Sequence, residues 1–282
     1  MTEQLKGKLY IVATPIGNLA DISFRAIETL KSADVIAAED TRRTRKLLSY
    51  YDVHTPLISF RVHNKVYQGR KLMERLLSGE NVALCSDAGM PLISDPGEDF
   101  VQACIEKEIP VTVIPGANAA TSALVLSGFS VKSFLYLGFI PRKSKKKHEF
   151  LNNLRNLEHT LIFYESPKRI VELLKDLNEC LGSRKACVAR ELTKVHEEVI
   201  RGTLDELIKL MDGREWKGEF TVVVEGATPP ENKNYFNVTD VVAEVKKLIL
   251  EGIPRNRAMK KTAEKYKMSK RAIYQIYLDY GL

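Results

Sequence analysis

The sequence has few cysteines, and their spacing does not suit a metal site. Its 282 residues include four, Cys85, Cys104, Cys180 and Cys187, with no CxxC pair and no paired histidines nearby. Zinc sites need such clusters of ligands, and redox pairs need the CxxC spacing. We therefore expect no metal, and we expect the four thiols to be free and buried.

Long apolar runs are also absent. A membrane-spanning helix needs about 20 consecutive apolar residues, and no stretch of this sequence approaches that length. The first residues, MTEQLKGKLY, lack the basic and then apolar pattern of a secretion signal. We expect a cytoplasmic protein with no membrane partner.

The common glycine-rich nucleotide motifs are missing as well. Neither GxGxxG nor GxxxxGKS/T occurs, so the usual dinucleotide and triphosphate sites find no support.

The net charge of +7 is unevenly distributed. Residues 255–271 contain eight lysines and arginines and one acid, Glu264, so this segment alone accounts for the whole net charge. A basic block of this kind favours a polyanionic partner such as nucleic acid.

The first part of the chain alternates short apolar runs with amphipathic segments, which is typical of a mostly parallel sheet covered by helices on both faces. The predicted strands are residues 8–13, 34–39, 56–60, 81–85 and 111–115, and the predicted helices are 24–33, 42–51, 66–78 and 97–107. We assign residues 1–116 to an N-terminal α/β domain.

After residue 117 the pattern changes. Strands are predicted at 134–140, 159–165, 186–192, 196–202 and 220–226, and two of them follow each other too closely for a helix, which indicates a mixed sheet. Ser166 before Pro167 predicts a helix N-cap, and TLDE at 203–206 predicts a capping box. A second α/β domain is expected at 117–228, a linker at 227–234, and a basic helical domain at 229–282.

Three loops that follow predicted strands combine glycine or proline with small polar residues. They are TPIGN (14–18), SDAGMPLISDPG (86–97) and PGANAATSA (115–123). Ligands of open α/β sheets bind outside the carboxyl ends of the strands. We expect these loops to form one site, in which Gly89 and Gly97 permit unusual backbone angles and the prolines stiffen the second loop.

Eight motifs in order resemble the bacterial ribosomal RNA small subunit methyltransferase I family, a branch of the tetrapyrrole-methylase superfamily. They are LYIVATPIGNLADIS, AAEDTRRTRKLL, SDAGMPLISDPG, VIPGANAATSALVLSG, FLYLGFIPRK, FYESPKRI, ARELTKVHEE and GEFTVVVEG, between Leu9 and Gly226. One departure is Arg61, which stands where that family leads us to expect a histidine.

The resemblance implies two α/β domains with S-adenosylmethionine in the cleft between them, and a homodimer. It implies that the acceptor is the ribose 2′-hydroxyl of a cytidine in the decoding region of 16S ribosomal RNA, as naked RNA or in the assembled 30S subunit. The residues expected on this basis to bind the cofactor are Pro15, Asp87, Gly89, Met90, Ile93, Asn118, Ala119, Tyr164, Leu192 and Thr221.

Methyl transfer to a hydroxyl needs an in-line arrangement of the reacting atoms and a group that accepts the proton. Glu39, Asp40 and Glu165 follow or end predicted strands, and we expect them near the acceptor. Each has a structural alternative, since Glu39 and Asp40 could cap the helix that begins at Thr41, and Glu165 could favour the dipole of the next helix.

Basic residues are expected to contact RNA in three places. Two are the start of the helix after Asp40 and the PRKSKKK run at 141–147, and the third is the C-terminal tail, where two helices split by a short turn resemble a helix-turn-helix. The alternative is an ordinary solvated charged surface. The residues are Arg42, Arg43, Arg142, Lys143, Lys145, Lys260, Lys261, Lys270 and Arg271.

Two other functions stay open at this point. A tetrapyrrole C-methyltransferase would share the fold and the cofactor cleft, although the basic tail and the AEDTRRT run favour RNA. A ligand-sensing regulator that binds nucleic acid through its tail would explain the tail but not the polar residues at the strand ends.

Overall fold

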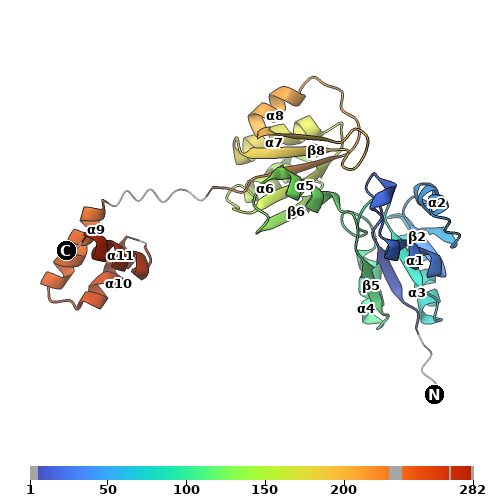
Figure 1. The fold of residues 1–282 in the computed structure, drawn as a ribbon, viewed down its shortest axis with the longest axis horizontal. Helices are drawn as coiled ribbons and strands as arrows, with labels where there is room; N and C mark the ends of the chain where they lie inside the picture. Colours follow the sequence, from blue (N-terminus) through green and yellow to red (C-terminus); the bar gives the residue numbers. More distant parts are fainter. Residues whose placement is uncertain (1–5, 229–236, 267, 281–282) are drawn as a thin grey trace, which may run out of the picture. The chain divides into compact units, whose positions relative to one another are not determined.

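The computed structural model describes residues 6–228, 237–266 and 268–280. The chain divides into two compact units, Met1–Ala227 and Thr228–Leu282. The first unit contains two lobes, each built on a five-stranded sheet, and the second contains helices (Figure 1). The expected α/β class with added C-terminal helices is confirmed. None of the described helices is long and apolar enough to span a membrane.

The sheet of the first lobe is entirely parallel, with the strand order β3-β2-β4-β1-β5. Its strands are β1 (Leu9–Val12), β2 (Val35–Ala38), β3 (Leu57–Ser59), β4 (Val82–Cys85) and β5 (Val111–Ile114). The helices between them are η1 (Leu19–Asp21), α1 (Phe24–Ser32), α2 (Thr41–Tyr50), α3 (Lys65–Leu77) and α4 (Glu98–Glu106). All five predicted strands and four predicted helices of this lobe are therefore present.

Two apolar clusters cover the two faces of this sheet. One joins Leu9, Val35 and Val82 to residues of α3 and α4 such as Leu72 and Phe100. The other joins Val12, Ile36 and Ala83 to residues of α1 and α2 such as Leu30 and Leu48. Because both faces are covered, the inner strands β2 and β4 are apolar and buried throughout, as is typical of parallel strands.

The second lobe has a mixed sheet in the order β6-β7-β10-β8-β9, in which only β6 and β7 are parallel. Its strands are β6 (Phe134–Gly138), β7 (Thr160–Glu165), β8 (Lys185–Arg190), β9 (Glu198–Thr203) and β10 (Phe220–Val224). Its helices are α5 (Ala119–Ser127), α6 (Ser144–Asn153), α7 (Ile170–Leu181) and α8 (Leu204–Met211). The mixed sheet agrees with the sequence prediction.

Neighbouring residues of these strands face opposite sides of the sheet, as the twofold period of a strand requires. Phe163 and Val222 pack on the side of α6, α7 and α8. Ile162 and Val223 pack on the side of α5, in a cluster that also includes Ile16 from the first lobe. The two lobes therefore share apolar packing.

The second unit is a small bundle of α9 (Val238–Leu250), α10 (Arg255–Lys265) and α11 (Lys270–Tyr280). Val241, Met259 and Ile273 are buried at its centre, and Tyr266, Met268, Ile276 and Tyr277 pack around them. The Ser269 hydroxyl accepts a hydrogen bond from the amide of Ala272 at the start of α11. Helices α10 and α11 correspond to the two helices predicted for this tail.

Two local predictions have different outcomes. The capping box at 203–206 is confirmed, because the side chains of Thr203 and Glu206 each accept a hydrogen bond from the other's amide. The N-cap at Ser166 is wrong, since α7 begins at Ile170 and residues 166–169 form a turn. Ser166 lies too far before α7 to cap it, since Arg169 occupies the N-cap position. Most of the predicted linker lies outside the described residues.

Candidate active-site cleft

The strand order of the first lobe brings the predicted loops together. Strands β2, β4, β1 and β5 are successive neighbours, so the loops after them emerge side by side at the carboxyl edge of the sheet. Thr14 and Gly89 join two of these loops through reciprocal backbone hydrogen bonds of 2.9 and 3.0 Å. The expected assembly of the loops at one edge is therefore present.

The loop at 86–97 is stiff and strained. Gly89 and Gly97 have φ values of 82° and 133°, which favour glycine, as the sequence predicts. Gly97 is also packed closely against Leu92. A Cβ at position 97 would lie 2.8 Å from the Leu92 Cδ2, which is too close. Leu92 and Ser94 have positive φ values of 74° and 69°. Backbone strain of this kind is concentrated at functional sites.

Ser94 also ties this loop to the second lobe. Its hydroxyl lies 2.5 Å from the Tyr136 hydroxyl on β6. A further close approach occurs at Gly17, where a Cβ would lie 2.7 Å from the Thr193 Oγ1. The Thr193 hydroxyl also accepts a hydrogen bond from the Asn18 amide at 3.0 Å. These contacts fix the separation of the two lobes at the cleft.

The main cleft has a volume of about 370 Å³ and receives residues from both lobes, which is within the range of small-molecule sites. Ile16, Glu39, Asp87 and Asp95 line it from the first lobe. The rest of the first unit contributes lining residues that include Ala119, Phe139, Tyr164, Glu165, Leu192, Phe220 and Thr221. The walls are thus largely apolar and carry a few carboxylates.

Three carboxylates of the first lobe influence each other. Burial, and then the negative charges of Glu39 and Asp87, raise the pKa of Asp95 from 3.8 to about 6, against the hydrogen bond from Ser86. Burial, and then the charge of Asp87, also raise the pKa of Glu39, against Arg61 and Arg43. Asp95 therefore retains its proton to a higher pH than an ordinary aspartate does.

Glu165 is the most buried carboxylate of the cleft. It ends β7, and its side chain is only 2% exposed. Its Oε1 accepts hydrogen bonds from the amide and hydroxyl of Ser166, at 2.7 and 3.1 Å. Its Oε2 lies 3.6 Å from an Arg169 nitrogen and accepts no hydrogen bond from the described residues. A buried acceptor without a donor is costly, so this oxygen suits a donor on a ligand.

The carboxylates of Asp40 and Asp87 accept hydrogen bonds from backbone amides at the start of α2. Asp40 caps the helix by accepting from the amide of Arg42 at 3.0 Å, and it lies 3.5 Å from the Arg61 guanidinium. The Asp87 carboxylate accepts from the amide of Asp40 at 2.7 Å. Arg61 also donates to the carbonyl of Glu39 at 2.7 Å. This residue, which departs from the expected histidine, thus holds the end of β2 in place.

The residues predicted to bind the cofactor fall into two groups. Asp87, Ile93, Ala119, Tyr164, Leu192 and Thr221 line the main cleft. Pro15 lines an adjoining hollow, Gly89 forms the bridge to Thr14, Met90 packs against the core of the first lobe, and Asn118 caps α5 through the amide of Thr121.

The residues predicted to contact RNA are exposed. Arg43 lines the main cleft and lies 3.7 Å from Asp87. Arg42 precedes it on α2, and Arg142, Lys143 and Lys145 surround the start of α6. In the second unit, Lys260, Lys261, Lys270 and Arg271 point to solvent. Lys143 and its neighbours place cations at a helix N-terminus, where the helix dipole favours anions instead.

Sequence reasoning missed Asp95 and misread Lys147. Asp95 lies in a loop that was singled out, and its SDPG context at a strand end was the available signal. Lys147 belongs to the basic run expected to flank the cleft, but its side chain is only 6% exposed. Its ammonium pairs with Glu172 and Asp176 at 2.6 Å each. Lys147 is therefore a structural residue of the α6 and α7 pair.

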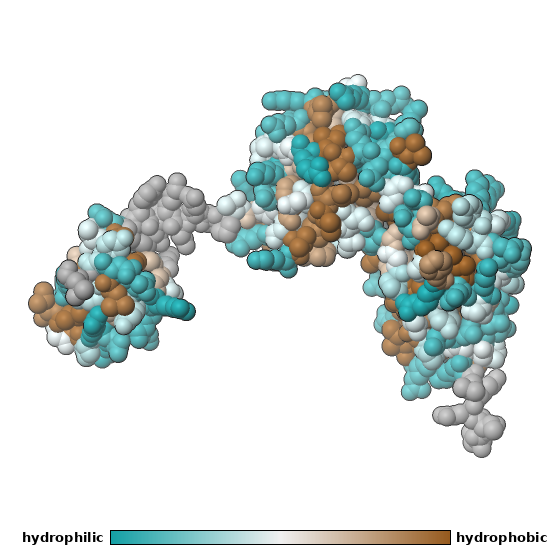
Figure 2. Space-filling view, in the orientation of Figure 1, coloured by the Kyte–Doolittle hydropathy of each residue, from teal (hydrophilic) through white to brown (hydrophobic). Residues whose placement is uncertain are grey.

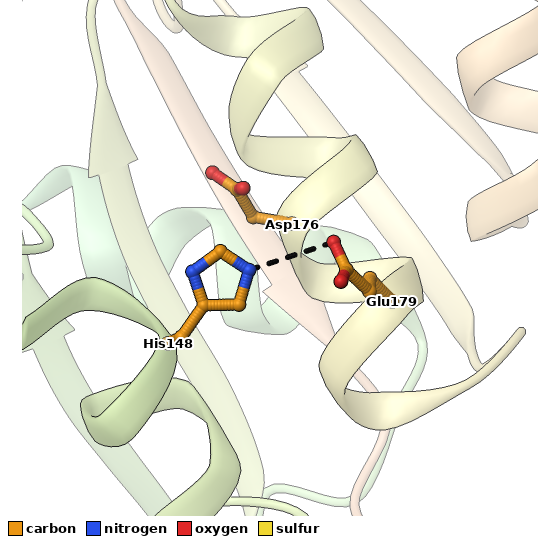
Figure 3. Close-up of side chains that lie close together, drawn as sticks. All are labelled: His148, Asp176 and Glu179. Atoms are coloured by element: carbon orange, nitrogen blue, oxygen red, sulfur yellow. Dashed lines mark ion pairs between the residues drawn. The ribbon is translucent and has the colours of Figure 1, made fainter. Parts of the chain in front are cut away.

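His148, Asp176 and Glu179 form a cluster that could hold a metal ion (Figure 3). The His148 Nε2 lies 3.5 Å from Glu179, and Asp176 is already neutralised by the Lys147 ammonium. A metal would have to compete with this built-in cation. The cluster lies on α6 and α7, and none of its members lines the main cleft.

Solved structures with this fold include a diphthine synthase and a uroporphyrin-III C-methyltransferase. A crystal structure of diphthine synthase aligns with a TM-score of 0.63 and 16% identity, covering 79% of this chain and 90% of that one. A uroporphyrin-III C-methyltransferase from Thermus thermophilus, solved with S-adenyl homocysteine, aligns with a TM-score of 0.55 and 16% identity, covering 77% and 97%. The two-lobed fold around a cleft is thus that of the tetrapyrrole methylases.

The sequence matches the Tetrapyrrole (Corrin/Porphyrin) Methylases family over residues 8–208. Curated proteins named ribosomal RNA small subunit methyltransferase I are 46% identical in Halalkalibacterium halodurans and 45% identical in Bacillus subtilis. Each alignment covers 96% of this chain, with 95% and 94% of the relative. The chain belongs to the tetrapyrrole methylase family and, within it, to the ribosomal RNA small subunit methyltransferase I family.

Proposed function

We propose that this protein transfers a methyl group from S-adenosylmethionine to the ribose 2′-oxygen of a cytidine in the decoding region of 16S ribosomal RNA. The observation that carries the proposal is the near-full-length likeness to relatives named for small-subunit ribosomal RNA. The solved structures leave about a fifth of this chain uncovered, which is about the size of the second unit. This difference favours RNA over a tetrapyrrole acceptor.

The residues of the main cleft fit the proposed cofactor. Apolar side chains such as Leu192 and Phe220 suit an adenosine moiety, and the unpartnered Oε2 of Glu165 suits an amino or hydroxyl donor. Thr221, which is 4% exposed, adds a buried hydroxyl to the wall. When bound, S-adenosylmethionine supplies an electrophilic methyl group on its sulfonium. The residues of this chain would orient it and exclude water.

The proton of the ribose hydroxyl needs an acceptor in the cleft. Among the predicted catalytic residues, Glu39 and Glu165 line the cleft, while Asp40 serves mainly to cap α2. Asp95 adds a carboxylate whose pKa, about 6, is closer to the pH of reaction than that of an ordinary aspartate. A base is most effective near the operating pH, so we assign proton acceptance to Asp95 and positioning to Glu39 and Glu165.

The exposed cations of the second unit are assigned to RNA docking. In the full-length chain, replacing Lys260, Lys261, Lys270 and Arg271 with glutamine should weaken binding of small-subunit RNA. The slope of log affinity against log salt should fall by about 3, because each lost phosphate contact contributes roughly 0.7 to 0.9. Fluorescence anisotropy over a salt series measures this, and calorimetry with S-adenosylmethionine serves as the control. Equal losses for both ligands would contradict the assignment.

The proposed function is tested by offering several acceptors to the purified protein with methyl-labelled S-adenosylmethionine. Parallel reactions contain small ribosomal subunits, naked 16S RNA or a tetrapyrrole precursor, and the label is followed into each acceptor. We expect transfer to RNA in one or both of the first two reactions. Transfer to the tetrapyrrole alone would support the C-methyltransferase instead, and transfer to none would support the ligand-sensing regulator.

A further inference from the structure

The outer face of α2 forms a shallow basic groove. Arg42, Arg45, Lys46, Ser49 and Tyr50 line a depression of about 600 Å³, which we call the α2 groove. These positions recur at helical spacing, and all five residues are exposed, whereas Thr44, Leu47 and Leu48 between them are buried. In Figure 2 hydrophilic residues cover the part of the surface where α2 lies. One face of α2 thus anchors the helix, and the other is free for a partner.

The cations of the α2 groove lack counter-ions among the described residues. Helix α2 contains four basic residues and no acid, and among the residues that the structure describes, none forms an ion pair with Arg42, Arg45 or Lys46. Arg42 also lies in the first helical turn, where the helix dipole disfavours a cation. Like charges crowded on one helix face destabilise it slightly. A polyanion bound in the groove would relieve both costs.

Tyr50 adds an exposed aromatic ring to this basic face. Its side chain is 67% exposed, and its ring packs edge-on against Tyr51, with the centroids 4.9 Å apart. Tyr51 is itself fixed, because its hydroxyl donates to the carbonyl of Leu19 at 2.6 Å. Tyr50 therefore presents a supported ring to solvent. Aromatic rings beside cations are the usual platforms for unpaired bases.

The α2 groove adjoins a hollow that borders the main cleft. It shares Lys46 with a hollow of about 210 Å³ that Pro15 and Leu19 also line. This hollow in turn shares Arg43, Asp87 and Lys194 with the main cleft. Tyr50 stands seven residues after Arg43, about 10 Å along the helix at 1.5 Å per residue. That length corresponds to about three nucleotides of a stacked strand.

We propose that the α2 groove binds the single-stranded RNA that flanks the target nucleotide, with one unpaired base stacked on Tyr50 and phosphates on Arg42, Arg45 and Lys46. The inference rests on the proposed RNA substrate. A single strand is favoured over a duplex because a base that stacks on an exposed ring must have left its own stack.

The test measures binding of the full-length protein to a fluorescein-labelled single-stranded RNA oligonucleotide and to its duplex. Tyr50→Ala should weaken single-strand binding about 5- to 150-fold, since stacking contributes about 1 to 3 kcal/mol per base. Tyr50→Phe should bind like the wild type, because it keeps the ring. Tyr67→Ala is the matched control, since Tyr67 is 60% exposed on α3 and lines none of these three sites. Thermal melts verify that each variant is folded.

Several outcomes would overturn the inference: equal binding by Tyr50→Ala and wild type, a loss in Tyr50→Phe as large as in Tyr50→Ala, or equal losses for duplex and single strand. A loss confined to assembled subunits would point to a ribosomal protein and would also overturn it. The proposed function fails separately, when wild-type protein transfers no methyl group to ribosomal RNA.

Discussion

Replacing Asp95 with asparagine is expected to lower kcat for methyl transfer about 10²- to 10⁴-fold, the usual contribution of a general base. Binding of S-adenosylmethionine should change little, because asparagine retains the size and the polarity of the side chain. In the wild type, kcat/KM should fall as the pH drops below about 6, where Asp95 becomes protonated. Single-turnover rates from pH 5 to pH 8 measure both effects.

The same substitution should make the protein more stable at pH 8. The folded chain holds the Asp95 proton more tightly than the unfolded chain, since the pKa rises from 3.8 to about 6. The stability contributed by that proton is complete below pH 3.8 and is lost as the pH rises through 6. Asparagine mimics the protonated form, so Asp95→Asn should gain about 1 to 3 kcal/mol at pH 8. Denaturant titrations at pH 8 and pH 4 should show the gain and its disappearance.

A substitution that slows the enzyme but stabilises it is typical of a side chain that serves function and lowers the stability of the fold. Asp99→Asn serves as the control, because Asp99 lies four residues further on, is 75% exposed and pairs with Lys65 outside the cleft. If Asp95→Asn keeps a near-wild-type kcat and an unchanged pH profile, Asp95 is not the proton acceptor.

Replacing Lys147 with methionine is expected to destabilise the first unit by about 3 to 5 kcal/mol, the cost of leaving a buried charge without its partner. The Lys147 side chain is 6% exposed, and that of Asp176 only 11%. Methionine has a similar length but cannot neutralise Asp176. Urea unfolding followed by circular dichroism measures the loss.

Two further variants distinguish the cost of leaving Asp176 unpaired from the cost of removing an exposed lysine. Lys146→Met removes the exposed neighbouring cation and should change stability by less than about 0.5 kcal/mol. The double variant Lys147→Met with Asp176→Asn removes both buried charges and should recover much of the loss. A Lys147→Met protein as stable as Lys146→Met would show that the pair is not needed for the fold.

Much of the fold can be predicted from the sequence because its signals are local. Apolar runs such as VALC at 82–85 are too short for a buried helix and are bounded by turn residues, so they indicate strands. The capping box at Thr203 is complete within four residues. The gathering of the strand-end loops follows from parallel strands alone, so the edge that carries the site was also predictable.

The remaining features depend on contacts between distant segments. Asp95 resembles a turn aspartate until the fold buries it and places Glu39, which follows β2, beside it. Lys146 and Lys147 are adjacent in one basic run, and only the packing of α6 on α7 decides which of them is buried. Ser166 does not cap a helix because residues 166–169 form a turn before α7 begins at Ile170.

The measurement that tests the central claim most directly is the position of the transferred methyl group. Small ribosomal subunits are incubated with the protein and S-adenosylmethionine that carries a deuterated methyl group, and the RNA is digested with nucleases and analysed by mass spectrometry. We predict one labelled nucleoside, a 2′-O-methylated cytidine from the decoding region. A label on a base, on the ribose of another region, or on no nucleotide would contradict the account.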